Sequence, residues 1–143
     1  MGSQANLTIN DGQSTPVAHT FYTNGAGWSD SLKGILASWV DRSQAAAVGF
    51  WKASLSFKEP TKGETNYRVV FKTETPVLEN VTNSTVSGIA PAPTVSYKPI
   101  SQTSFSVPER STADSRKDQL AIHRNGLALA IVTSAVVDLE PTT

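Results

Sequence analysis

The chain has 143 residues, of which 38% are hydrophobic and 17% charged, so it has the composition of a folded domain and is neither disordered nor membrane-spanning. Twelve Lys and Arg residues balance twelve Asp and Glu residues, which excludes binding to nucleic acid through an overall basic charge. The absence of cysteine excludes disulfides and thiolate metal sites. The N-terminus lacks the apolar core of a signal peptide, and the longest apolar stretch, Leu127–Val137, is too short for a membrane span. We therefore expect a soluble, intracellular protein.

The first elements along the chain are expected to be β-strands. Leu7–Asn10 and Val17–Phe21 flank Asp11-Gly12, which is a strong turn signal because glycine accepts a positive φ, so a hairpin is predicted. Asn24–Gly27 is expected to break the chain. Ile35–Val40 is rich in β-branched and aromatic residues and predicts a further strand.

The next two segments, Phe50–Lys58 and Asn66–Thr75, alternate in character with a period of two, and Pro60–Glu64 makes the turn between them. In the first segment one side carries Trp51, Ala53, Leu55 and Phe57, and the other carries Lys52, Ser54, Ser56 and Lys58. Consecutive alternating strands joined by short turns predict an antiparallel sheet with one dry face and one wet face.

A long loop and a final strand follow. Pro76–Pro93 is rich in small and polar residues, and a loop of this length in a small domain is usually functional or mobile. Thr94–Val107 is predicted to be the last strand, with an edge position or a bulge at Pro99. Ser111 is then expected to cap a helix, with Asp114 as the reciprocal carboxylate of a capping box.

The helical tail becomes apolar on every side after Gly126, within Leu127–Val132. Such a helix must be covered on every side, and in a domain with one sheet the extra cover is expected from a second subunit. Thr133 or Ser134 is expected to cap a short second helix that ends near Leu139.

The sequence offers no catalytic or metal-binding constellation. His19 lies in an expected strand, where one cross-strand partner accounts for it, and His123 lies on the expected exposed part of the helix. Asp114 and Asp118 are placed on a solvated helix face. No nucleophile, base and orienting carboxylate occur together, and no phosphate-binding or dinucleotide loop is present. We expect no enzyme, no catalytic residue, no metal and no cofactor.

One constellation rises above the background, and it lies on the wet face of the predicted sheet. There Glu74 is the single carboxylate among five basic side chains, namely Lys52, Lys58, Arg68, Lys72 and Lys98. A solubilising surface explains this charge equally well for a single subunit. The small hydroxyls of Ser54 and Ser56, together with a whole sheet face left uncovered, favour contact with RNA phosphates and unstacked bases.

Several stretches together resemble the coat proteins of single-stranded RNA bacteriophages, the levivirus family. The order and length of the elements match over essentially the whole chain. The stretches that carry the resemblance are Phe105–Thr112, Arg116–Asp118, Val136–Pro141, Leu7–Phe21, and Asn66–Lys72 with the Pro76 that follows.

The resemblance implies one α+β domain over residues 1–143, β-rich at 1–107 and helical at 111–139. It has an N-terminal β-hairpin, a five-stranded antiparallel sheet and C-terminal helices packing across a dimer partner. Dimers would assemble into an icosahedral shell in the host bacterial cytoplasm, with the loop Thr75–Pro93 at the symmetry axes. The implied partners are a second copy, viral single-stranded RNA and the phage maturation protein, with no membrane. The implied location is the virion.

The resemblance also implies a use for the wet face, which would line the shell interior, package RNA and grip a hairpin that represses replicase translation. Val70 departs from the family pattern, because a polar pocket residue is expected there. The implied RNA-binding residues are Lys52, Ser54, Ser56, Lys58, Arg68, Lys72, Lys98 and Gln102.

Two other classes compete with this interpretation. A small β-rich binding or adhesion module would be monomeric and free of nucleic acid, whereas a coat protein forms large particles that carry RNA. An enzyme with a cofactor held in the sheet lacks any supporting cluster of residues.

Overall fold

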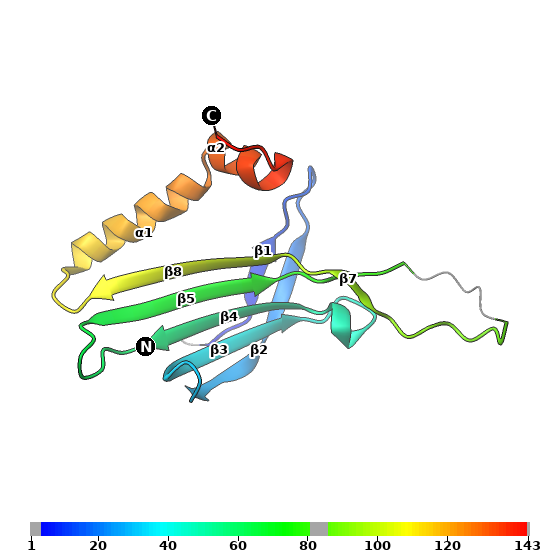
Figure 1. Cartoon of the computed structure of the whole chain (residues 1–143), viewed down its shortest axis with the longest axis horizontal. Coiled ribbons are helices and arrows are strands. Elements are labelled where there is room, and N and C mark those ends of the chain that lie inside the picture. Colours follow the sequence, from blue (N-terminus) through cyan, green and yellow to red (C-terminus); the bar gives the residue numbers. More distant parts are fainter. Residues whose placement is uncertain (1–3, 81–85, 143) are drawn as a thin grey trace. The chain divides into compact units, whose positions relative to one another are not determined.

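The computed structural model describes residues 4–80 and 86–142. The chain divides into two compact units between Ser106 and Val107. In chain order, the elements of the first unit are β1 (Leu7–Asn10), β2 (Ala18–Ser29), β3 (Gly34–Asp41), the short 3₁₀ helix η1 (Ala47–Gly49), β4 (Trp51–Lys58), β5 (Asn66–Glu74), β6 (Val77–Leu78), β7 (Val95–Tyr97) and β8 (Ile100–Pro108), whose last two residues belong to the second unit (Figure 1).

The large sheet has six strands in the order β1-β2-β3-β4-β5-β8, so strands that follow each other from β1 to β5 are neighbours. The pairs from β1 to β5 are all antiparallel, which confirms the predicted meander. The sheet has one strand more than predicted because β2 is long enough to pair with both β1 and β3. The N-terminal hairpin, with Leu7 opposite Phe21, thereby joins the sheet.

The predicted break at Asn24–Gly27 is wrong, because β2 continues through it to Ser29 with a bulge between Thr23 and Gly25. Gly25 has φ 103°, a conformation that costs glycine little. The side chain of Asn6 accepts a hydrogen bond from the Thr23 amide at 3.1 Å. The N-terminal segment therefore supplies a partner for a backbone amide beside the bulge.

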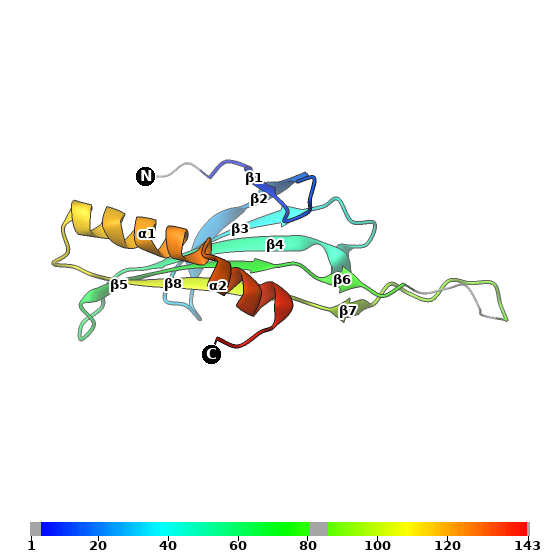
Figure 2. The ribbon, with the colours of Figure 1, turned by 90° about the horizontal axis from the view of Figure 1, so that it is seen from above.

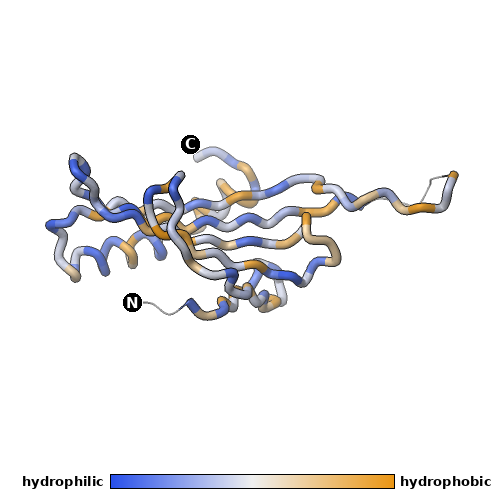
Figure 3. Tube along the Cα trace, turned by 90° about the horizontal axis from the view of Figure 1, so that it is seen from below, coloured by the Kyte–Doolittle hydropathy of each residue, from blue (hydrophilic) through white to orange (hydrophobic). Residues whose placement is uncertain are grey.

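Alternation along β4 gives the large sheet two chemically different faces. The tube in Figure 3 changes repeatedly between hydrophobic and hydrophilic along the strands. We call the side that carries Lys52, Ser54, Ser56 and Lys58 the lysine face, and the opposite side the apolar face. Neighbouring strands keep this division, because residues directly opposite in the register share a face.

A small core lies on the apolar face, at the end of the sheet nearest the N-terminal hairpin. Phe21, Trp39 and Ala53 are buried there, with Leu7 among the residues packed against them. The Trp39 indole donates a hydrogen bond of 2.8 Å to the carbonyl of Ala5. The N-terminal segment thus covers the core and also supplies the polar partner that a buried indole needs.

The segment Thr94–Val107, predicted as one strand, is two strands divided at Lys98-Pro99. Pro99 has no amide hydrogen for the ladder, but its carbonyl accepts a hydrogen bond from Thr75 at 3.1 Å. Before it, β7 pairs with β6 in a separate two-stranded sheet (Figure 2). The long predicted loop thus contains β6, and its residues 81–85 lie outside the described part of the chain.

The second unit holds α1 (Ala113–Leu127), α2 (Ala130–Thr133) and the π-helical turn η2 (Ser134–Asp138). The axis bends by 59° between α1 and the segment 130–138. No single described helix is long and apolar enough to cross a membrane; this bent pair passes by length and composition only.

Two predictions about the helical tail are wrong in detail. The cap of α1 is Thr112, whose side chain accepts from the Ser115 amide at 3.3 Å, while Ser111 donates its hydroxyl to the Pro108 carbonyl at 2.7 Å. Ser111 therefore closes the preceding turn, one residue too early for a cap. The second helix begins at Ala130, not at Thr133 or Ser134.

Candidate nucleic-acid interface

The lysine face is built by cross-strand rows on β3, β4 and β5. Because the strands are in antiparallel register, each row brings together two or three side chains from separate strands. The rows are Val40, Lys52 and Glu74; Ser38, Ser54 and Lys72; Leu36, Ser56 and Val70; and, on β4 and β5 alone, Lys58 and Arg68.

The structure brings all eight predicted site residues to three cavities on this face. The largest, of about 640 Å³, is lined by six of them: Ser54, Ser56, Lys58, Arg68, Lys72 and Gln102. A second cavity of about 310 Å³ contains Lys52, and a third of about 410 Å³ contains Lys52 and Lys98. The cavities share lining residues, so they form one continuous surface.

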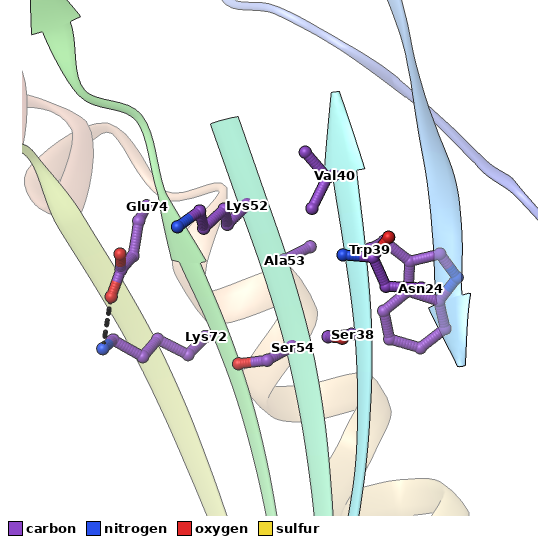
Figure 4. A pocket seen from close by; sticks show the side chains of 9 residues that line it. All are labelled: Asn24, Ser38, Trp39, Val40, Lys52, Ala53, Ser54, Lys72 and Glu74. Atoms are coloured by element: carbon purple, nitrogen blue, oxygen red, sulfur yellow. Dashed lines mark ion pairs between the residues drawn. The ribbon is translucent and has the colours of Figure 1, made fainter. Parts of the chain in front are cut away.

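Figure 4 shows the second cavity, with Lys52 and Ser54 of β4 between Ser38 of β3 and Lys72 of β5. Glu74 lies at its edge and forms an ion pair with Lys72. The second cavity therefore combines two lysines, one carboxylate and two serine hydroxyls. This set can bind a phosphate and can also donate to or accept from the edge of a base.

Glu74 has more partners than the sequence indicated, because Lys98 also approaches it at 3.4 Å. The hydrogen bond from Lys72 holds the pKa of Glu74 below its usual range, against the opposing effect of burial, and Lys98 adds to the lowering. One carboxylate thus partly neutralises two of the predicted cations.

Lys58 is paired as well, with Glu64 of the β4–β5 turn at 2.8 Å. This hydrogen bond lowers the pKa of Glu64. Among the described residues Lys52 and Arg68 make no ion pair of 4 Å or less. The positive charge of the lysine face is therefore less uniform than the sequence predicts.

Sequence reasoning missed the part of this face that comes from β3 and from the turn before it. Leu36 and Ser38 follow the same alternation as β4, and this signal was present in Ile35–Val40. The turn residues Leu32 and Lys33 line the largest cavity, and nothing in the sequence placed them there.

His19 lies outside this face and has two carboxylate partners, not the single partner predicted. Its Nδ1 is 2.9 Å from Asp41 and its Nε2 is 3.5 Å from Asp11, while its ring centroid is 4.4 Å from that of Trp51. His123 is partly buried, contrary to the exposed position predicted for it. The described residues contain no cluster of His, Cys, Asp and Glu that could hold a metal ion.

Comparison with known proteins identifies the class. The family model described as levivirus coat protein matches residues 3–142, so the chain belongs to the levivirus coat protein family. A search of curated proteins finds no match.

Solved structures agree with this assignment. A protein from the virus-like particle of bacteriophage ESE058 is 36% identical, with a TM-score of 0.89 over 99% of this chain and 100% of that one. One from the virus-like particle of bacteriophage NT-214 is 30% identical, with a TM-score of 0.84 over the same shares. One from Beihai levi-like virus 21, at 19% identity and a TM-score of 0.81 over 99% of both chains, shares the fold.

The protein is therefore a structural capsid protein of a bacteriophage virion and not an enzyme. This family membership excludes the two alternatives that the sequence left open, a β-rich adhesion module and an enzyme with a cofactor held in the sheet. The predicted α+β fold is confirmed.

Proposed function

We propose that the chain dimerises, that its dimers assemble into a closed icosahedral shell, and that the lysine face binds the viral single-stranded RNA packaged inside. The observation that carries the RNA part is the convergence of all eight predicted residues on the connected cavities of one sheet face.

Exposed surface supports dimerisation. The chain exposes 10860 Å², whereas a folded monomer of 15.2 kDa exposes about 7,100 Å² by the usual scaling with mass. An exposed area this large favours a chain that buries part of its surface against another copy.

The exposed surface is also apolar in two places, one in each unit. On the apolar face of the sheet, Trp28 is 66% exposed and Ile35, opposite it, is 50% exposed. Phe57 lies opposite Ile35 on β4, and Leu55 follows on the same face of that strand. In the second unit no residue of α1, α2 or η2 is buried. The large apolar residues exposed there are Leu120, Ile122, Leu127, Leu129, Ile131, Val136, Val137 and Leu139. We propose that the helices of one subunit cover the apolar face of its partner.

Charge supports RNA packaging. The chain has a formal net charge of +0, yet five basic side chains lie on its lysine face. Glu74 pairs with two of them, Lys72 and Lys98, and Glu64 of the β4–β5 turn pairs with Lys58. Phosphate contacts of this kind bind nucleic acid with little regard to sequence and weaken as salt rises.

Repression of replicase translation through a hairpin would use the same face. Ser54, Ser56 and Gln102 supply hydroxyl and amide groups that can read base edges in an unpaired loop. Hairpins from the start of the phage replicase gene should then bind more tightly than shuffled sequences of equal length. A maturation-protein contact stays a prediction from the family resemblance.

The test is a triple variant, Lys52→Ala with Lys58→Ala and Lys72→Ala, expressed and purified as particles. RNA per particle, measured by absorbance at 260 and 280 nm, should fall. The salt slope of single-stranded RNA binding should become shallower by about two, at about 0.7 per lost phosphate contact.

The matched control is Lys62→Ala with Lys117→Ala, which removes two exposed lysines that line none of the three cavities. Its RNA content should equal that of the wild type. An unchanged RNA content in the triple variant, with folded particles, would show that the assigned face is wrong.

A further inference from the structure

The turn between β2 and β3, Asp30–Lys33, lies at the wall of the largest cavity on the lysine face. Ser31, Leu32 and Lys33 line this cavity together with Arg68 of β5 and Gln102 of β8. This turn was not among the predicted site residues, and the family match by itself assigns it no role.

The position of the turn is fixed by a glycine that no other residue can replace. A Cβ on Gly34 would collide with the carbonyl oxygen of Phe57 and would lie 3.0 Å from the Cα of Lys58. The backbone of the turn therefore packs directly against the backbone of β4. Two hydrogen bonds brace it further, from the Trp28 indole to Asp30 at 3.0 Å and between the hydroxyls of Ser29 and Ser31 at 3.1 Å.

Lys33 adopts φ 51°, one of two non-glycine residues with positive φ in the described part of the chain. This conformation is costly for lysine, and glycine or asparagine would suit the turn better. Backbone strain of this kind tends to persist where a side chain is needed. Lys33 is exposed and makes no ion pair among the described residues, so its charge is free to meet a ligand.

The lining of this cavity differs from that of the other two. The smaller cavities both contain Glu74, whereas no carboxylate lines this one. Three apolar side chains also line this cavity, beside its basic and hydroxyl groups: Leu32 of the turn, Leu36 of β3 and Val70 of β5. At about 640 Å³ the cavity is within the usual range for a small organic ligand.

We propose that the turn Asp30–Lys33 is the outer wall of a pocket for one unstacked nucleotide of single-stranded RNA. Leu32 contacts the face of the base, and Lys33 contacts its phosphate. The inference rests on the proposed RNA-binding function and adds the two turn residues that set affinity and base preference there. An apolar contact surface beside cations suits a base with its phosphate better than phosphate alone.

The experiment measures binding of the full-length protein, freed of packaged RNA, to ten-nucleotide oligoadenylate and oligouridylate over a range of salt. Lys33→Gln should weaken both about fivefold at 0.1 M salt and make the salt slope shallower by about 0.7, the contribution of one phosphate contact. Lys62→Gln removes the same charge from the β4–β5 turn and should change neither value.

Two more variants separate a binding role from a structural one. Lys33→Gly relieves the positive φ, so the protein should be at least as stable to urea and still lose the same fivefold affinity. Leu32→Ala should weaken oligoadenylate more than oligouridylate, because the larger purine ring makes more contact with the leucine.

Wild-type affinity in Lys33→Gln and Lys33→Gly, or equal losses in Lys62→Gln, would overturn the inference. If Lys52→Ala, Lys58→Ala and Lys72→Ala together still abolish binding in that case, the proposed RNA function stands without the turn. A wild-type protein that binds neither oligonucleotide would overturn both.

Discussion

The basic side chains of the lysine face do not offer equal charge to RNA. Lys72 and Lys98 are held by Glu74, whereas Lys52 and Arg68 make no ion pair among the described residues. An RNA phosphate bound as proposed would therefore compete with Glu74 for Lys72 and Lys98, and would meet Lys52 and Arg68 without such competition. Because the pKa of Glu74 is lowered, the carboxylate keeps its charge until the pH falls below its usual 4.5. Only below that pH does protonation release both lysines.

A second prediction at the scale of single residues concerns Asp41, a buried carboxylate with only 4% of its surface exposed. Its carboxylate contacts His19 at 2.9 Å and accepts from the Ser43 amide at 2.9 Å. Burial tends to raise the pKa of Asp41, but the hydrogen bonds from Ser43 and His19 outweigh it and leave the pKa below 3.8. Asp41→Asn should lower the free energy of unfolding by about 1–3 kcal/mol at pH 6, measured in urea.

The pH dependence follows from the sign of the shift. Because the folded pKa of Asp41 is depressed, its contribution is complete above 3.8 and is lost as pH falls through the lowered value. The gap between wild type and Asp41→Asn should therefore shrink below about pH 4. Asp118→Asn changes an exposed carboxylate of α1 and is the control, with little effect at either pH. An equal gap at pH 6 and pH 3 would contradict the assigned cause.

At the scale of elements, what the sequence predicts depends on whether the signal is local. The period of two in β4 and β5 placed Lys52, Ser54 and Lys72 on one face correctly, since alternation needs only neighbouring residues. The pairing of Glu74 with Lys98 was missed because it depends on where a later strand starts. The bulge at Gly25 was taken for a break for the same reason, since Asn6 stabilises it from a distant segment.

The start of α1 gives a prediction that separates two adjacent residues. Thr112 has an extended backbone and accepts from Ser115, as a cap does, whereas Ser111 bonds back to Pro108. Thr112→Ala should therefore lower stability by about 1 kcal/mol. Ser111→Ala should lower it less, because its bond is made in an exposed turn. Thermal unfolding of the two variants measures both stability losses. A larger loss in Ser111→Ala than in Thr112→Ala would show that Ser111 is the cap.

At the scale of the whole molecule, the single chain has too small a core for its length. Of the described hydrophobic residues only Phe21, Trp39, Val40 and Ala53 are buried. Domains of about 150 residues usually bury about 68–70% of the surface of the unfolded chain around one core. In the proposed dimer, the second copy supplies the rest of this core by covering the apolar face of the sheet and the helices.

A charge placed in the helical unit should have opposite consequences in the single chain and in the proposed dimer. Ile131 of α2 is 56% exposed in the single chain, so an aspartate there meets water and leaves the isolated fold largely unaffected. In a dimer with a dry interface the same aspartate would be an unpaired buried charge, which costs several kcal/mol. Ile131→Asp should therefore abolish dimers and particles in size-exclusion chromatography. Gln119→Glu adds the same charge at an exposed polar position of α1 and should assemble normally. Normal particles from Ile131→Asp would mean that a different surface buries the partner.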